Sequence, residues 1–191
     1  MRNILFTATI AAMLFSAAPP SASAHPFDQT YESAVDALEA YRVLIRDYPE
    51  DLDLHYLLGS MLIKANELEE AVERFEFVLE QKPHYDMAWY KLAEVYYRQE
   101  KFEKALEVVQ NMQDESLEDD KLIAEATIYL KLEKPEKTLE VSKKAVEIDE
   151  LNPGGWLHIG LAHRDLGHTD RAVEFMLKSL KMDPTQPLAY D

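Results

Sequence analysis

The 191-residue chain carries 36 acidic and 20 basic residues, which gives a formal net charge of −16, and it contains no cysteine. A surface this acidic excludes binding to nucleic acids and to anionic membranes, because both require clustered lysine and arginine. The lack of cysteine excludes disulfides and thiol chemistry. Stability must therefore come from burial of the apolar residues, which make up 47% of the chain.

Residues 1–24 have the three-part pattern of a secretory signal peptide. Arg2 supplies the positive charge, Ile4 to Ala18 form a mostly apolar core, and Ala22-Ser23-Ala24 form a small-residue cleavage site. A membrane anchor is the alternative, but a bilayer span takes about 20 apolar residues and this stretch is shorter. We expect cleavage after Ala24 and a periplasmic or secreted mature chain without stable membrane insertion. Since Arg2 is the only charged residue of the leader, the mature net charge is −17.

Residues 25–51 begin with His25-Pro26-Phe27 and continue as an amphipathic helix expected from about 28 to 47. Its apolar side contains Val35, Leu38, Tyr41 and Leu44. Helical spacing of this kind predicts one buried face. We interpret the helix as a half repeat that caps the array of helices that follows it.

The stretch Asp86–Val109 contains two short amphipathic segments, with apolar faces formed by Trp89, Leu92, Ala93 and Tyr96 and by Phe102, Ala105, Leu106 and Val109. Only residues 98–101 separate the two segments, which leaves room for a tight turn and nothing more. Two amphipathic helices joined this closely fold back on each other as a helical hairpin.

The hairpin pattern recurs at intervals of 34, 33 and 34 residues, which aligns Ala71, Ala105, Thr138 and Ala172 in one column. The other columns are His55, Trp89, Leu122 and Trp156; Leu58, Leu92, Glu125 and Ile159; Gly59, Ala93, Ala126 and Gly160; Leu62, Tyr96, Tyr129 and His163; and Phe75, Val109, Ser142 and Met176. Pro83 and Pro184 close the first and last units. These columns resemble the tetratricopeptide repeat (TPR) family, and the resemblance covers Leu52–Gln186.

The resemblance implies an all-α fold, a right-handed superhelical solenoid of antiparallel helix pairs. The units expected are 52–85, 86–118, 119–152 and 153–186, with a tail at 187–191; their helices are expected near 52–65, 68–82, 86–99, 102–113, 119–132, 135–149, 153–166 and 169–182. The third unit departs from the family pattern at Glu125, Thr138, Ser142 and Glu150, so its register is open to a one-residue shift. The acidic connector 113–120 lacks the order of residues found in a calcium-binding loop, which favours a solvated turn.

Members of the family bind peptides or protein segments in the concave groove formed by the first helix of each unit. Carried over by column, the resemblance implies a partner-binding groove formed by Tyr56, Ser60, Ile63, Tyr90, Glu94, Tyr97, Arg98, Ile123, Thr127, Leu130, Lys131, Leu157, Leu161 and Arg164. This surface is apolar and aromatic with a basic edge, which suits a segment with apolar anchors and a few acids. Tyr56 and Ser60 stand where some members begin a carboxylate clamp, so that specificity is not expected. The alternative is that the tyrosines only stabilise the packing of the helices and bind no partner.

No catalytic motif is present, since the spacings of nucleophile elbows, phosphate loops, dinucleotide sites and zinc proteases are all absent. We therefore expect a non-catalytic scaffold without cofactor or metal, active in envelope assembly or protein maturation. Two alternatives remain open. Phe175, Met176 and Leu180 of the last helix form a face for self-assembly or pack within the unit. A free N-terminal His25 offers nitrogen ligands for copper, which would make the chain a metal or small-ligand carrier.

Overall fold

The structure is a computed structural model that describes residues 34–184. Within this range the chain is helical and contains no strand, which confirms the all-α prediction. The helices are α2 (Ala34–Asp47), α3 (Leu52–Ala65), α4 (Leu68–Gln81), α5 (Asp86–Arg98), α6 (Phe102–Val109), the short 3₁₀ segment η2 (Glu115–Leu117), α7 (Glu118–Lys131), α8 (Pro135–Ile148), α9 (Pro153–Asp165) and α10 (Thr169–Met182). The predicted leader, His25, the helix before Ala34 and the tail at 187–191 lie outside the described residues.

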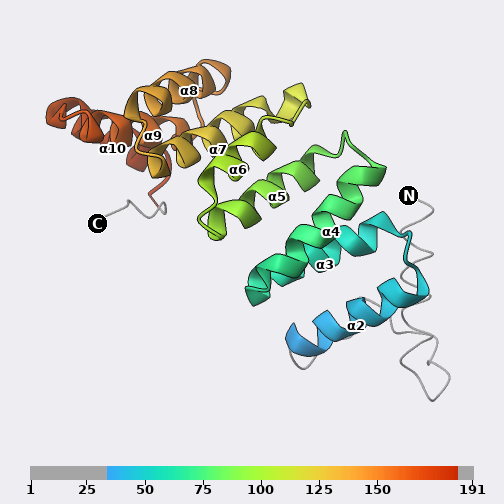
Figure 1. Cartoon of the computed structure of the whole chain (residues 1–191). Helices are drawn as coiled ribbons and strands as arrows, with labels where there is room; N and C mark the ends of the chain where they lie inside the picture. The colour runs from blue at the N-terminus through green and yellow to red at the C-terminus, as the bar shows by residue number, and fades with distance from the viewer. Residues whose placement is uncertain (1–33, 185–191) are drawn as a thin grey trace, which may run out of the picture.

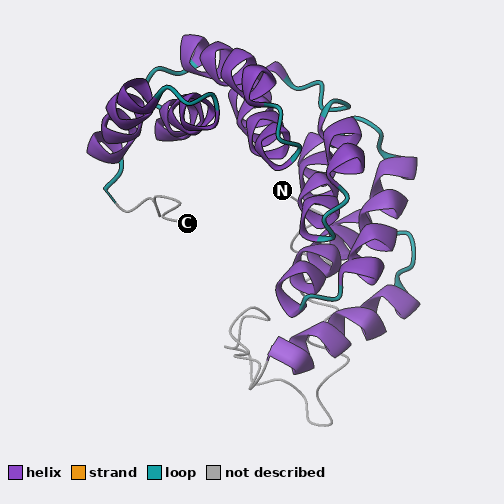
Figure 2. Ribbon diagram, turned by 60° about the vertical axis from the view of Figure 1, so that its left-hand side comes forward, coloured by secondary structure: helices purple, strands orange, loops and turns teal. Residues whose placement is uncertain are grey.

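Consecutive helices pack on each other along the whole array, from α2 on α3 to α9 on α10 (Figure 1). Each unit is a hairpin of two helices, and the second helix of one unit also packs on the first helix of the next. Figure 2 shows that the stacked hairpins curve into an arc. The expected solenoid of antiparallel helix pairs is therefore confirmed.

The turn inside each hairpin has the same conformation in all four units. Its left-handed residue is Asn66, Glu100, Glu133 or Gly167, with φ of 61°, 59°, 54° and 77°. The next amide donates back to the carbonyl of Leu62, Tyr96, Tyr129 or His163, at 2.8 to 2.9 Å. This bond closes the end of the first helix as in a Schellman motif. The acceptors form one column of the sequence repeat, so the repeat period and the turn geometry agree.

A second recurring bond fixes the start of the first helix in three units. The indole N–H of Trp89 donates to the Pro83 carbonyl at 2.8 Å, and that of Trp156 donates to the Glu150 carbonyl at 2.9 Å. In the first unit His55 takes the tryptophan position, and its Nε2 lies 3.0 Å from the Pro49 carbonyl. Because a carbonyl can only accept, Nε2 of His55 carries the proton.

Helix contacts within the hairpins combine a small residue on the first helix with a larger one on the second. A Cβ atom added at Gly59 would lie 2.8 Å from the ring of Phe75, which is fully buried. One added at Gly160 would lie 2.7 Å from Cγ of Met176. The helices approach this closely only because these positions have no side chain.

The third unit keeps the register of the other units despite its unusual residues. Thr138 and Ser142 are fully buried, as are Ala71 and Phe75 in the equivalent columns of the first unit. The Ser142 hydroxyl has no hydrogen-bond partner among the described residues. Glu125 is buried, and burial raises its pKa, opposed by the charges of Lys121 and Lys144.

Helix α6 ends at Val109, four residues before the predicted end at 113. The Asn111 side chain donates to the Glu107 carbonyl at 3.1 Å, and the buried Asp86 carboxylate accepts from the Gln113 amide at 3.1 Å and from the Asp114 amide. The bonds to Asp86 hold the chain that follows α6 at the start of α5. The connector 113–120 is therefore anchored at Asp86, and Asp114 caps η2 through the Ser116 amide at 2.9 Å.

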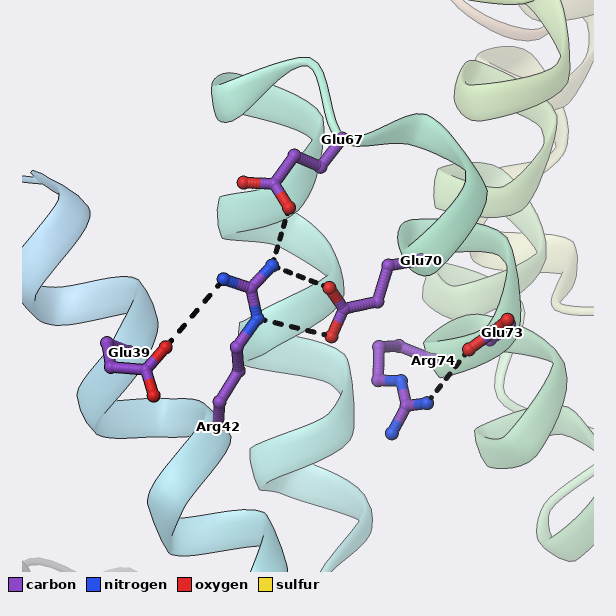
Figure 3. Close-up of polar contacts among 6 residues, drawn as sticks. All are labelled: Glu39, Arg42, Glu67, Glu70, Glu73 and Arg74. Carbon is purple, nitrogen blue, oxygen red and sulfur yellow. Dashed lines mark hydrogen bonds and ion pairs between the residues drawn. The ribbon is translucent and has the colours of Figure 1, made fainter.

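Arg42 joins α2 to the start of α4 (Figure 3). One of its guanidinium nitrogens lies 2.6 Å from a Glu70 oxygen and 2.5 Å from a Glu67 oxygen. Hydrogen bonds to Glu70 and Glu67 raise the pKa of Arg42 above its ordinary value. Ala37, Leu38 and Leu44 of α2 are buried, so apolar packing and a charge cluster together hold α2 on the first unit.

Candidate functional site

The first helices of two neighbouring pairs of units contact each other, since α3 contacts α5 and α7 contacts α9. Between α5 and α7 there is a hollow of about 170 Å³. Its lining residues are Tyr90, Ala93, Glu94, Tyr97, Ala124, Thr127 and Ile128. The structure thus brings together four residues predicted for the groove, namely Tyr90, Glu94, Tyr97 and Thr127.

Tyr90 also lines a second hollow, of about 200 Å³, together with Met87, Met112, Leu117 and Asp120. The side of α5 that faces α7 is therefore hollowed at both levels beside Tyr90. Tyr90 and Met87 remain 37% and 42% exposed, which makes them accessible to a ligand. Burial and the nearby Asp120 raise the pKa of Tyr90, so its hydroxyl stays neutral at physiological pH.

The charged residue of the hollow is neutralised within α5. One Glu94 oxygen accepts from Lys91 at 2.9 Å, and the other accepts from Arg98 at 2.9 Å. The Arg98 guanidinium also reaches the Ile63 carbonyl of α3, at 3.5 Å. Two cations share one carboxylate, so the cluster of Lys91, Glu94 and Arg98 carries a net positive charge.

Thr127 is held by a hydrogen bond across the inner surface to α9. Its Oγ1 lies 2.9 Å from Nε2 of His158, whose Nδ1 lies 2.8 Å from the Gly154 carbonyl. Burial lowers the pKa of His158 and keeps the imidazole neutral. The Gly154 carbonyl accepts from Nδ1, and the Thr127 hydroxyl donates to the Ile123 carbonyl of its own helix at 2.9 Å. The far wall of the hollow is therefore positioned by the next unit.

Other predicted groove residues belong to the packing between helices. Ile63 and Leu161 are 3% and 8% exposed, so neither offers a surface to a partner. Ile63 belongs to the buried apolar cluster that runs from α2 to α7. Tyr56 packs on Tyr85 at 5.3 Å between ring centroids. The Ser60 hydroxyl donates to the Tyr56 carbonyl at 2.9 Å and is occupied within its own helix.

The remaining predicted residues lie on α7 and α9 and do not line the hollow. Ile123, Leu130 and Leu157 are half-buried, and Lys131 and Arg164 are exposed. Arg164 lies 2.8 Å from Asp165. The prediction omitted Ala93, Ala124 and Ile128, which form the apolar floor. Ala93 belongs to the column of small residues in the sequence repeat. That column indicates a position at the hollow without a bulky side chain.

No group of three or more histidine, cysteine or acidic side chains is placed to hold a metal ion anywhere in residues 34–184. His25, the candidate copper ligand, lies outside this range. His55 and His163 are buried in their repeat columns. Among the described helices none is long and apolar enough to cross a membrane.

Comparison with known proteins agrees with this architecture. Sequence models of the tetratricopeptide repeat match residues 36–73, 62–124 and 153–186. No curated protein sequence matches the chain. A crystal structure of the MamA protein superposes with a TM-score of 0.73 at 18% identity, covering 93% of this chain and 92% of that one.

Two further solved structures share the fold. MamA 41-end from Desulfovibrio magneticus RS-1 has a TM-score of 0.70 at 23% identity and covers 81% of this chain and 88% of its own. YrrB, described as a TPR protein with an unusual peptide-binding site, has a TM-score of 0.60 at 24% identity. The match covers 77% of this chain and 76% of YrrB. The repeated columns, the recurring turn and the matched models together establish that this chain belongs to the tetratricopeptide repeat family.

Proposed function

We propose that this chain is an exported, non-catalytic scaffold that binds a segment of a partner protein in the groove between α5 and α7. The observation that carries the proposal is the pair of hollows on either side of Tyr90. Tyr90 lines both hollows and stays 37% exposed, so its ring can contact a ligand. Exposed apolar surface next to a concavity is typical of a binding site.

The chemistry of the hollows defines the segment that fits. The floor of Ala93, Ala124 and Ile128 accepts an apolar anchor, and Tyr90 and Tyr97 contact its sides. The cations of Lys91 and Arg98, which share Glu94, favour an acidic residue next to the anchor. The ligand is therefore an extended or helical segment with a large apolar residue and a neighbouring Asp or Glu.

The proposed setting is the cell envelope, in assembly or protein maturation. It is supported by the leader-like residues 1–24 and by the acidic, cysteine-free composition, which suits export without disulfides. The family match supports a protein-binding role, and YrrB, a structural neighbour, is described as having a peptide-binding site.

The test is site-specific photo-crosslinking in the cells that make the protein. A photo-reactive phenylalanine analogue at position 90 is expected to yield a defined crosslinked partner, and the same group at Glu103 on α6 none. Binding of the identified segment is then measured by calorimetry. Tyr90→Ala combined with Tyr97→Ala should weaken binding at least tenfold, since each aromatic anchor contributes about 1 kcal/mol or more.

Tyr48→Ala provides the matched control, because Tyr48 is 38% exposed but lies in the α2–α3 turn, away from the groove. Helicity should be unchanged in all variants. A partner that binds the double variant as tightly as the natural protein would place the binding site elsewhere.

Self-association through α10 is the second candidate function. Phe175, predicted for this face, stacks on Trp156 and His163 at 5.8 and 5.6 Å and is half-buried. Val173 and Leu177, one helical turn apart, are instead exposed by 52% and 49%. If copies associate here, sedimentation velocity will show a concentration-dependent size that Leu177→Asp abolishes. A constant monomer at all concentrations would remove this candidate.

A further inference from the structure

Another side of α5 faces a cavity larger than either hollow of the groove. An outer cleft of about 480 Å³ lies between α4 and α6, over α5. We define the outer cleft by its lining residues: Glu76, Leu79, Glu80, Trp89, Leu92, Tyr96, Lys104, Glu107, Val108 and Asn111. Trp89 and Tyr96 lie one position before Tyr90 and Tyr97, so one helix presents an aromatic pair to each side. The outer cleft is therefore separate from the groove proposed above.

The last hairpin contains the equivalent place, 67 residues further along the chain, and there the cleft is filled. Phe175 stands at the position of Val108 and stacks on Trp156 with 5.8 Å between ring centroids. Lys178 stands at the position of Asn111, and its ammonium lies 3.2 Å from the Trp156 ring centroid. The protein thus covers one of its two tryptophans with a cation and an aromatic ring.

Trp89 has neither of these partners. Val108 and Asn111 are shorter than Phe175 and Lys178, and among residues 34–184 no ring or cation stacks on the Trp89 indole. Its indole N–H is already bonded to the Pro83 carbonyl, which fixes the ring at the cleft wall. The open volume therefore coincides with the place where the last hairpin carries an ammonium group.

The charges around the outer cleft also favour a cation. Glu80 and Glu107, on opposite walls, make no hydrogen bond or ion pair through their carboxylates within the described part of the chain. Glu76 accepts from the Tyr96 hydroxyl at 3.1 Å. Lys104, also in the lining, lies 5.7 Å from the Tyr96 ring centroid, and Lys101 lies 6.0 Å from it. Two free carboxylates thus flank an uncovered indole, which is a typical setting for a cation–π contact.

We propose that the outer cleft binds a lysine or arginine side chain of a partner polypeptide, with the aliphatic stem on Leu79, Leu92 and Val108 and the charge over Trp89. The bound side chain takes the place that Lys178 occupies in the last hairpin. Glu80 and Glu107 neutralise its charge. The scaffold then has a cation-selective site separate from the groove.

The probe is a capped tetralysine peptide, titrated into the ¹⁵N-labelled protein at about 0.15 M salt to screen long-range attraction. A tetrapeptide of acetyl-lysine has the same backbone and stems without charge and is the neutral comparison. The chain has two tryptophans, so two indole N–H signals report on the open and the filled cleft. Tetralysine should shift the Trp89 signal and leave Trp156 nearly unchanged, and the acetylated peptide should shift neither.

Two double variants test the assignment. Val108→Phe with Asn111→Lys rebuilds the filled cleft of the last hairpin and should weaken tetralysine binding about tenfold, the scale of one good cation–π contact. Glu80→Gln with Glu107→Gln should weaken it severalfold without altering the apolar walls. Glu147→Gln with Glu174→Gln is the matched control, because it removes the same charge at the equivalent positions of the filled cleft. It should leave the affinity within twofold of the natural protein.

Three results would overturn the proposal. Equal shifts of both indole signals would mean that tetralysine follows the overall negative charge. Equal weakening of binding by Glu80→Gln with Glu107→Gln and by Glu147→Gln with Glu174→Gln would also mean that tetralysine follows the overall negative charge. Unchanged tetralysine binding to the variant that combines Val108→Phe with Asn111→Lys would show that the cation lies outside the cleft.

Discussion

Replacing Gly160 by alanine places a methyl group into the contact between α9 and α10. The new Cβ would lie 2.7 Å from Cγ of Met176, 3.1 Å from the Ala172 carbonyl oxygen and 3.1 Å from the Met176 amide nitrogen. Nonbonded carbon atoms prefer a separation of about 3.5 to 4.0 Å. Two of the three neighbours are backbone atoms, so the helices must separate to accommodate the methyl group.

The expected magnitude follows from two opposing contributions. Overpacking of a close contact costs about 1–3 kcal/mol, and alanine regains about 1 kcal/mol over glycine within a helix. Because two of the three contacts involve backbone atoms, the cost lies in the upper part of that range, about 2–3 kcal/mol, and the net loss of unfolding free energy is about 1–2 kcal/mol. For a chain of this length such a loss lowers Tm by about 2–8 °C. Circular dichroism at 222 nm with heating or urea measures both quantities.

Gly59→Ala tests a clash with a side chain alone, whereas Gly160→Ala also tests a clash with the backbone. At Gly59 the three nearest atoms, at 2.8 to 3.1 Å, all belong to the Phe75 ring, so Phe75→Leu should relieve the added methyl group. At Gly160 the double change with Met176→Ala should recover only part of the loss, because the backbone contacts remain. Gly154→Ala is the control and should lower stability less than Gly160→Ala, since its nearest neighbour, at 3.1 Å, is the side-chain oxygen of Asn152 and the next atoms lie 3.6 Å or more away. A Gly160→Ala variant as stable as the natural protein would refute the close-contact argument.

Three further predictions follow from other parts of the chain. Glu133→Gly should raise the unfolding free energy by about 1 kcal/mol in urea denaturation, because Glu133 has a φ of 54° that favours glycine; an unchanged or lower value would contradict this reasoning. Burial lowers the pKa of His55, so the unfolded chain takes up the proton first as pH falls below about 6.5, and stability should decrease between pH 7 and pH 5.5. His55→Trp, which restores the tryptophan of the column, should reduce that pH slope, and an identical slope would exclude His55 as its source. Intact-mass analysis of the exported protein should show a chain beginning at His25, and a retained leader would exclude cleavage after Ala24.

Much of the fold is already contained in local patterns. The apolar spacing and the 34-residue period predict the helices after residue 52 to within a few residues, because both depend on interactions between neighbours in sequence. The aligned columns also identify which residues meet inside a hairpin, as Gly59 and Phe75 do. The end of α6 escaped prediction because it depends on Asp86, 27 residues away from Gln113 in the sequence.

The candidate sites required more than periodicity. Helical spacing placed Tyr90 and Tyr97 on one face of α5, and the structure puts both beside one hollow. Spacing also assigned Ile63 and Leu161 to the groove, yet both are buried, because the neighbouring helix decides which side of a helix stays open.

The sequence by itself determined a repeated helical hairpin, its period and the faces that each helix buries. Only the tertiary structure decided where the packed array leaves space. Val108 and Phe175 occupy the same column, and only the packed helices show that the first leaves Trp89 uncovered and the second covers Trp156. The physical reason is that a cavity is a property of several helices at once, set by the sizes of side chains that are distant in sequence.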